Sequence, residues 1–300
     1  MTREEERTHG SMIRSGAAAY DRAVIPTYEL NDGHTIPAIG FGTYPLSGAE
    51  GVDAVVSAIA AGYRLIDTAV NYGNEAEVGE AIRASGVPRD ELFVTSKLPG
   101  RHHAHADAIA STEESLERLG LDHLDLHLIH WPNPSVGRYH EAWRALVELR
   151  ERGLVRSIGV SNFTAAHLER IIDDSGVTPA VNQLELHPGF PQAEMRAVHD
   201  RLGIRTEAWS PLGKRQAKYG DPAVAVPAER LGVTPAQVVL RWHVQLGSLP
   251  IPKSADPERQ RQNLDVFGFE LTDEEMTAIS ALGRADGRLF GGDPDVHEEM

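Results

Sequence analysis

The chain has 300 residues, of which 41% are hydrophobic and 24% charged, and its formal net charge is -15. This composition is globular, the absence of Cys excludes disulfides, Cys-ligated zinc and thiol catalysis, and the acidic balance argues against nucleic acid and anionic membranes as partners. No apolar run approaches the ~20 residues needed to span a bilayer, so we expect a soluble protein in a reducing, cytoplasmic setting.

Residues 1–24 are charged and lack a continuous apolar segment, which predicts a flexible extension rather than a signal peptide. The run "YELNDGHTIP" follows, with the turn residues Asn31, Asp32 and Gly33 between two short strand-like stretches. This pattern predicts a β-hairpin at the start of the folded part of the chain.

From residue 38 onward, apolar strand-like runs alternate with amphipathic helical patterns. The strand-like runs are "AIGFGTY", "YRLIDTA", "LFVTSKL", "LDLHLIH", "VRSIGVSN", "AVNQLEL", "RTEAWSP" and "SLPIPKS". Several of the helical patterns between them stop at a Gly, as helix C-caps do. The alternation predicts a parallel sheet with right-handed crossovers, and eight repeats between residues 38 and 265 fit an α/β fold of the (β/α)8 TIM barrel type.

The chain closes with one more helix and a loop-like tail. Thr272 and Glu275 form a capping box, which predicts the start of this helix. Because no linker divides the chain, we expect residues 25–300 to form a single barrel domain. A doubly wound nucleotide-binding sheet is the weaker alternative, because "GFGTYP" has Pro45 where a third Gly belongs.

Polar side chains recur at the end of one strand-like run after another. Asp67, Lys97, His130 and Asn162 are separated by 30, 33 and 32 residues, close to one strand-helix unit each. In a barrel these positions share the carboxyl-terminal rim, where barrel active sites lie. A single such residue would usually be a helix cap or a solvated charge, but several in register predict a functional site.

Tyr72 follows Asp67 in a polar loop, and its phenol suits proton transfer if a neighbouring group perturbs it. A free phenol has a pKa of about 10, and an ammonium such as that of Lys97 lowers this pKa by favouring the phenolate. Asp67 can hold the ammonium in place, and a neutral His130 can orient a carbonyl group beside the phenol. This set transfers only a proton, so we expect a cofactor to supply a hydride.

The remaining rim residues fit such a cofactor. Asn162 and Gln183 can bond a carboxamide, and the indole of Trp209 can stack on a flat ring. An anion site is expected where the eighth strand ends and the next helix begins. The residues expected there are Lys253, Ser254 and Arg259.

Together these motifs resemble those of the aldo-keto reductase family, and most closely its bacterial 2,5-diketo-gluconate reductase-like members. "GYRLIDTAVNYGNE" looks like the first family signature, and "TSKL", "LIHWP", "IGVSNF", "VNQLELHP", "AWSPLG" and "IPKS" follow in family order. The similarity runs from about residue 28 to 284. It implies a monomeric (β/α)8 barrel that reduces aldehydes and ketones to alcohols with NADPH.

The resemblance also implies a role for individual residues. Tyr72 would be the general acid, Lys97 and Asp67 would tune it, and His130 would orient the carbonyl group. The cofactor would be bound by Gly42, Thr43, Ser161, Asn162, Gln183, Trp209, Ser210, Leu212, Gly213, Lys253, Ser254, Arg259, Gln262 and Asn263. The residues expected to border the substrate are Tyr44 and Trp131.

Two positions depart from the family pattern. Asp256 stands where relatives often carry a basic residue, and Gln262 stands where a Glu often precedes Asn263. The carboxylate of Asp256 would repel a 2'-phosphate, whereas Lys253 and Arg259 would attract it. We therefore expect NADPH as the cofactor and NADH as the second choice.

Two other functions are open at this point. "RHHAHAD" gathers His102, His103 and His105, which would suit a metal-dependent hydrolase on the same barrel, although no ligand-spaced carboxylate accompanies them. Some barrels of this family are non-catalytic, cofactor-bound regulatory subunits of membrane channels. That role would predict a damaged catalytic set, whereas all four members are present here. We therefore expect an enzyme without a metal ion.

Overall fold

A short antiparallel hairpin opens the part of the chain that the computed structural model describes, which is residues 25–299. The extension expected over residues 1–24 lies outside the described residues. Strand β1 (Thr27–Glu29) pairs with β2 (Thr35–Pro37), so the predicted hairpin is confirmed. Ile36 packs against Leu65, Leu126 and Leu249, which lie at or near the amino ends of barrel strands, so the hairpin covers that end of the barrel.

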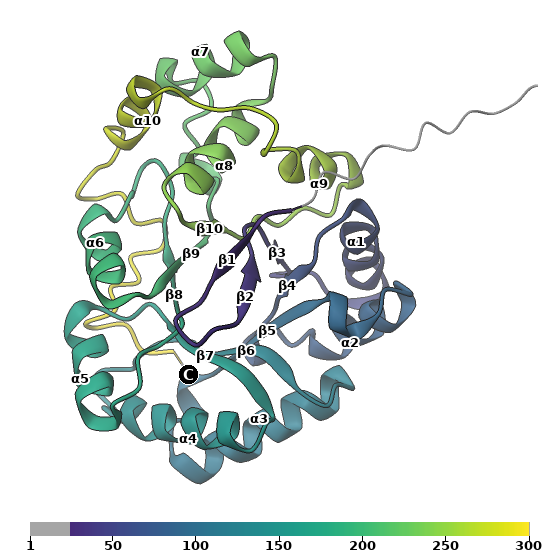
Figure 1. Ribbon diagram of the computed structural model, residues 1–300, viewed down its shortest axis with the longest axis vertical. Coiled ribbons are helices and arrows are strands. Elements are labelled where there is room, and N and C mark those ends of the chain that lie inside the picture. Colours follow the sequence, from purple (N-terminus) through teal and green to yellow (C-terminus); the bar gives the residue numbers. More distant parts are fainter. Residues whose placement is uncertain (1–24, 300) are drawn as a thin grey trace, which may run out of the picture.

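Eight parallel strands follow in sequential order around a ring (Figure 1). The strands are β3 (Phe41–Gly42), β4 (Leu65–Asp67), β5 (Phe93–Leu98), β6 (Leu124–Ile129), β7 (Val155–Ser161), β8 (Val181–Glu185), β9 (Arg205–Trp209) and β10 (Leu249–Pro250). The ring closes through backbone hydrogen bonds from Gly40 to Pro250 at 3.0 Å and from Gly42 to Pro252 at 3.2 Å. The predicted (β/α)8 TIM barrel is therefore confirmed.

Helices cover the outside of this ring (Figure 1). The α-helices are α1 (Gly48–Ala61), α2 (Glu75–Ala84), α3 (His105–Leu119), α4 (Tyr139–Glu151), α5 (Ala165–Ser175), α6 (Ala193–Leu202), α7 (Pro222–Leu231), α8 (Pro235–Gln245), α9 (Pro257–Leu264) and α10 (Asp273–Ser280). Short 3-10 turns are η1 (Val70–Tyr72), η2 (Arg89–Glu91), η3 (Gly100–His102) and η4 (Lys214–Gln216). The predicted capping box at Thr272 is present at the start of α10. None of the helices within residues 25–299 combines the length and apolar character that a membrane crossing requires.

The strands are buried on both faces, because the ring encloses one face and the helices cover the other. All six residues of β6 are buried, including Asp125 and His127. A polar side chain that enters this interior therefore needs a partner there. This constraint applies to every rim residue that the sequence places at the end of a strand.

The segment after α10 has no helix or strand and runs back to the carboxyl ends of the barrel strands. In Figure 1 it is the yellow trace that leaves α10 and passes α6. Backbone amides of Arg284 and Leu289 bond the Gly189 carbonyl at 3.1 Å and the Glu185 carboxylate at 2.6 Å. Farther on, the amide of Glu299 donates to Asn133 at 3.0 Å. The tail is thus held against the loops that follow β8 and β6.

Gly79 allows α2 and α3 to approach closely, because a Cβ added there would lie against the Leu119 carbonyl oxygen and 2.9 Å from the Leu119 Cα. We expect Gly79→Ala to lower the free energy of unfolding by about 1–3 kcal/mol, since the two helices must separate. Urea unfolding followed by circular dichroism would measure the change. Gly220→Ala is the control, because a Cβ there meets nothing within 4 Å. Equal stability of the two variants would contradict this account of the helix contact.

Candidate active site

A buried ion pair lies at the carboxyl ends of β4 and β5. Asp67 is the last residue of β4, and Lys97 lies near the end of β5, with side chains 2% and 0% exposed. The Lys97 ammonium donates to Asp67 Oδ1 at 2.6 Å and to the Thr68 carbonyl at 2.9 Å. Burial alone would lower the pKa of Lys97, but the adjacent Asp67 carboxylate raises it above its ordinary value. The lysine is therefore a fixed positive charge.

Tyr72 ends the 3-10 turn that follows β4, and this turn aims its phenol at the ion pair. The Tyr72 hydroxyl lies 3.3 Å from Lys97 Nζ, within the reach of a hydrogen bond. Burial raises the pKa of Tyr72 to about 12, although Lys97 acts to lower it. The expected effect of the ammonium is therefore present, but desolvation of the phenolate, which the sequence did not indicate, outweighs it. At neutral pH the phenol holds its proton.

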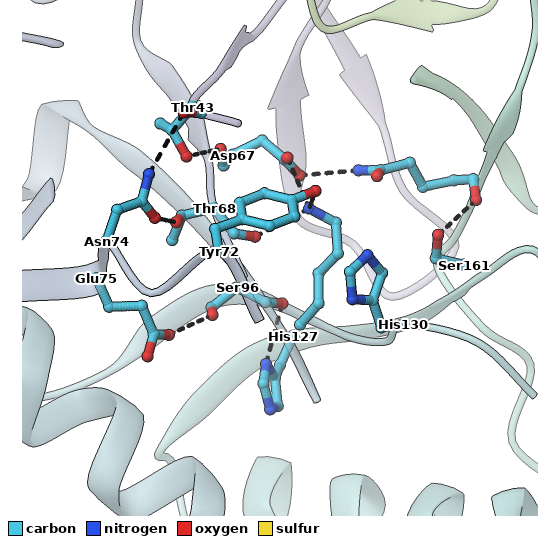
Figure 2. A network of polar contacts seen from close by, with 12 residues as sticks. Thr43, Asp67, Thr68, Tyr72, Asn74, Glu75, Ser96, His127, His130 and Ser161 are labelled. Carbon is cyan, nitrogen blue, oxygen red and sulfur yellow. Dashed lines mark hydrogen bonds and ion pairs between the residues drawn. The ribbon is translucent and has the colours of Figure 1, made fainter. Parts of the chain in front are cut away.

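His130 comes directly after β6 and faces the same region. Its ring centroid lies 5.8 Å from that of Tyr72 in an edge-on arrangement. Figure 2 shows the phenol of Tyr72, the carboxylate of Asp67 and the imidazole of His130 converging from three different segments of the chain. On its other side, His130 Nδ1 lies 2.7 Å from a carboxylate oxygen of Glu299 in the tail. The structure thus brings together all four residues of the predicted proton-transfer set.

The three side chains expected to hold a carboxamide form a network of their own beside this set. Gln183 donates from Nε2 to Asp67 Oδ2 at 2.8 Å, and Ser161 donates to the Gln183 carbonyl at 2.8 Å. Asn162 accepts the Trp209 indole N–H at 2.8 Å and donates to the His130 carbonyl at 3.0 Å. These amides therefore link the indole to the ion pair, an arrangement that their sequence positions did not indicate.

The segment after β9 makes a tight turn at residues 210–213, directly after Trp209. The Gly213 amide bonds the Ser210 carbonyl at 2.9 Å, and both residues have positive φ, 73° and 49°. A glycine at position 213 adopts this left-handed conformation without the strain that a Cβ would add. Leu212 lies between them and is partly buried. The turn places a run of backbone beside the partly exposed indole.

Two cations stand at the start of α9, near the end of β10. Lys253 and Arg259 are exposed, and within residues 25–299 neither forms an ion pair. Asp256 is the N-cap of α9, where its carboxylate accepts the amides of Glu258 at 2.8 Å and Arg259 at 3.3 Å. The Asp256 amide in turn bonds the Ser254 hydroxyl at 3.1 Å. The residue that departs from the family pattern thus has a structural role in capping the helix.

The other predicted cofactor residues lie in different parts of the barrel and have different contacts. Thr43 is buried and donates to the Asp67 carbonyl at 2.9 Å, so it supports the strand that carries the carboxylate. At Gly42, an added Cβ would lie 3.0 Å from the Ile251 carbonyl oxygen, so the glycine permits ring closure. Asn263 is 5% exposed, and its side-chain amide forms no hydrogen bond with residues 25–299. Gln262 bonds Glu258 at 3.2 Å and lines a different cavity.

That cavity has a volume of about 990 Å³ and lies at the amino end of the barrel, beside the hairpin. Its walls include Arg64, Asp125 and Arg156, and Gln262 is its one member of the predicted site. The predicted chemistry is thus at the opposite end from this large cavity. Gln262 shares helix α9 with Arg259 and Asn263, but it lines this cavity and not the rim that carries Asp67 and Lys97.

The comparisons with known proteins agree with this geometry. Residues 38–284 match the family model described as the Aldo/keto reductase family. The chain belongs to this family. The aldo-keto reductase is 63% identical over 276 residues to 2,5-diketo-D-gluconic acid reductase B of Corynebacterium sp. (strain SHS752001), an alignment that covers 92% of this chain and 99% of the relative.

Two solved structures are also similar to the aldo-keto reductase. A Brucella melitensis aldo/keto reductase has a TM-score of 0.83 and 48% identity, covering 86% of this chain and 99% of that one. The Gox0644 D53A mutant in complex with NADPH has a TM-score of 0.88 and 45% identity, covering 92% of this chain and 100% of that one.

The residues expected at the substrate end of the aldo-keto reductase lie at the mouth of the barrel. Tyr44 is 55% exposed, and its ring centroid lies 5.2 Å from that of Tyr72. The ring centroid of Trp131 lies 4.2 Å from that of His297 in the tail, with the two planes tilted by 50°. The loop with His102, His103 and His105 does not assemble a metal centre, since no group of three or more candidate ligands occurs within residues 25–299.

Sequence reasoning missed two carboxylates beside the predicted set, Glu207 and Glu299. Glu207 on β9 is paired in register with Gln183, so both side chains point into the barrel. Burial raises the pKa of Glu207 to about 8, with a further contribution from Asp67, while the neighbouring Gln183 amide and Lys97 ammonium oppose this rise. The sequence does contain a signal for Glu207, because an acidic residue inside the strand-like run "RTEAWSP" indicates a buried carboxylate. Glu299 gave no such signal, because nothing in its local sequence indicates the return of the tail.

We expect Glu207→Gln to stabilise the protein, and by more at pH 8 than at pH 5. The folded-state pKa of Glu207 lies above its unfolded value, so as pH rises between these two values the unfolded chain releases a proton that the folded protein retains. Stability is lost over that window, by up to a few kcal/mol, and the glutamine variant escapes this loss.

Urea unfolding of wild type and variant at pH 5 and pH 8 would measure the difference. The exposed Glu229→Gln serves as the control, because it makes the same chemical change on the surface of α7. A stability difference between wild type and Glu207→Gln that is equal at the two pH values would show that Glu207 is ionised across the whole range.

Proposed function

We propose that this aldo-keto reductase reduces the carbonyl group of a small aldehyde or ketone to an alcohol, with NADPH as the hydride donor. The observation that carries the proposal is the contact of the Tyr72 hydroxyl with Lys97, which Asp67 holds inside the barrel, beside the ring of His130. This arrangement combines a proton donor, a fixed positive charge and an orienting imidazole at one point.

The residues around that point suit a dinucleotide. Trp209 offers a partly exposed indole face, and Asn263 offers a side-chain amide that has no hydrogen-bond partner among residues 25–299. Lys253 and Arg259 supply two positive charges without ion-pair partners in the described chain, beside the amino terminus of α9. Cations at a helix amino terminus are a favourable setting for a phosphate group. Two structural neighbours are complexes with NADPH, which agrees with this donor set.

The proposed chemistry assigns the proton transfer to the protein. When bound, NADPH supplies a hydride to the carbonyl carbon. Tyr72 donates its proton to the carbonyl oxygen as the alcohol forms, and the proton is replaced from solvent. The Lys97 ammonium stabilises the resulting phenolate. Asp67 accepts a hydrogen bond from this ammonium at 2.6 Å and so holds it close to the phenol.

His130 and the amide network would position the reacting groups. The imidazole would donate a hydrogen bond to the carbonyl oxygen, which places that oxygen next to the Tyr72 hydroxyl. Ser161, Asn162 and Gln183 would hold the carboxamide of the cofactor beside the buried ion pair. In the structure Asn162 bonds the Trp209 indole and Gln183 bonds Asp67. These hydrogen bonds fix the positions of the indole and of the ion pair relative to the proposed carboxamide site.

We also propose that the enzyme acts as a monomer in the cytoplasm. The family resemblance supports the monomer, and the absence of Cys fits a reducing compartment. Size-exclusion chromatography with light scattering and cell fractionation would test the two statements.

Removal of the Tyr72 hydroxyl tests the catalytic assignment. We expect Tyr72→Phe to lower kcat by about 10²–10⁴-fold, because the carbonyl oxygen loses its proton donor, while the dissociation constant for NADPH stays within about twofold. A panel of aldehydes and ketones that includes 2,5-diketo-D-gluconate, assayed by NADPH absorbance, would provide the rates. Tyr28→Phe is the matched control, since Tyr28 lies in the hairpin at the opposite end of the barrel. Near wild-type turnover by Tyr72→Phe would refute the assignment.

Replacement of Asp256 tests the cofactor preference. We expect Asp256→Ser to lower the KM for NADPH by about fivefold and to leave the KM for NADH unchanged, because serine retains the helix cap but removes a negative charge near the proposed 2'-phosphate site. Steady-state kinetics with the two cofactors would measure the ratio. Asp221→Ser is the control, as Asp221 caps α7 in the same way. An equal change for both cofactors would place the 2'-phosphate elsewhere.

A further inference from the structure

A fully buried carboxyl group lies inside the barrel, next to the residues proposed to hold the cofactor carboxamide. Glu207 is the middle residue of β9 and is 0% exposed. It is paired in register with Gln183 of β8 and with Leu249 of β10, which are also buried. An acid at such a position costs free energy relative to an apolar residue, so it needs a compensating contact.

The side-chain amide of Gln183 supplies this contact. One N–H of the amide donates to Asp67 Oδ2 at 2.8 Å. The same amide acts to lower the pKa of Glu207, which is the effect of an N–H directed at a carboxyl group. The NH2 group of Gln183 therefore lies between two carboxyl groups, that of Asp67 on β4 and that of Glu207 on β9.

This arrangement determines which atom of Gln183 is left for a ligand. A glutamine side chain has two N–H donors on its nitrogen and one accepting oxygen. With both donors directed at Asp67 and Glu207, only the carbonyl oxygen remains to bond a group outside the protein. With an apolar residue at position 207, the amide would keep its bond to Asp67 alone and would be free to turn about it.

We propose that Glu207 is a positioning residue, whose carboxyl group orients the Gln183 amide so that the glutamine carbonyl oxygen accepts an N–H of the cofactor carboxamide. The inference rests on the proposed function, since it concerns the cofactor of that same site. Glu207 can act in this way while it holds a proton, because the carbonyl oxygen of a neutral carboxyl group still accepts a hydrogen bond. The role therefore agrees with an interior in which Lys97 and Asp67 already balance each other.

The test compares NADP with its 3-acetylpyridine analogue, which keeps the carbonyl group on the ring but has no N–H there. Quenching of tryptophan fluorescence in the full-length chain would give both dissociation constants without turnover. We expect wild type to bind NADP about tenfold more tightly than the analogue, because the analogue leaves the Gln183 oxygen unpaired. In Glu207→Leu this ratio should fall to about twofold, through weaker binding of NADP.

The conservative variant Glu207→Gln separates positioning from a merely structural role. Its side-chain oxygen can accept the same N–H, so we expect a ratio within about twofold of wild type. Glu207→Met is a second apolar variant with a flexible side chain, and it should behave like Glu207→Leu. Thr95→Val is the control, because it removes a fully buried polar group from β5, a strand that does not adjoin β8. This control should leave the ratio unchanged.

A double-mutant cycle shows whether Glu207 acts through the glutamine. Gln183→Leu alone should lower the ratio of the two dissociation constants to about twofold, since it removes the accepting oxygen. The addition of Glu207→Leu to Gln183→Leu should change this ratio no further. Independent effects of the two substitutions would overturn the proposal, because Glu207 would then act by another route.

The outcomes separate this role from the proposed function. If wild type neither binds NADP nor reduces any carbonyl compound with NADPH, the proposed function fails. If wild type does both, but Glu207→Leu and Glu207→Met keep the wild-type ratio, the positioning role is overturned and the proposed function stands. Equal affinity of wild type for NADP and the analogue, or a loss of discrimination in Glu207→Gln or Thr95→Val as large as that in Glu207→Leu, would overturn it as well.

Discussion

The buried ion pair between Lys97 and Asp67 is the interaction on which the rest of the site depends. An ammonium inside a barrel is strongly destabilising unless an anion and further acceptors surround it, and breaking a buried pair typically costs about 3–5 kcal/mol. Here the lysine has a carboxylate at 2.6 Å and a backbone carbonyl at 2.9 Å. The second oxygen of Asp67 accepts Gln183, whose backbone carbonyl accepts Ser161. One ion pair thus ties together β4, β5, β7 and β8.

Charge balance in the interior explains several perturbed groups at once. Lys97 carries one positive charge, and two carboxylates, Asp67 and Glu207, share its surroundings. The interior is neutral when one of these carboxylates holds a proton, which agrees with the raised pKa of Glu207. Burial likewise keeps the proton on Tyr72. Tyr72 is therefore protonated at neutral pH, and in the proposed mechanism the Lys97 ammonium would stabilise the phenolate that remains after proton transfer.

The inner and outer parts of the proposed site are built from different kinds of structure. The inner end, with Asp67 and Lys97, belongs to the strands and follows from the register of the parallel sheet. The outer end is formed by loops and by the tail, which reaches His130 only after it has passed α6 and bonded Asn133. Loops on a rigid barrel can change without loss of the fold, so the proposed chemistry would depend on the inner part and substrate selectivity on the outer part.

The sequence by itself determined the order of strands and helices and the rim on which polar residues gather, because both follow from local periodicity. Strand ends such as Asp67 and His130 recur at about one strand-helix unit, so their shared edge could be predicted without coordinates. Only the tertiary structure decided the proton affinity of Tyr72, the bond of Gln183 to Asp67 and the contact of Glu299 with His130. These depend on burial and on contacts between residues more than 100 positions apart, and no local pattern encodes either one.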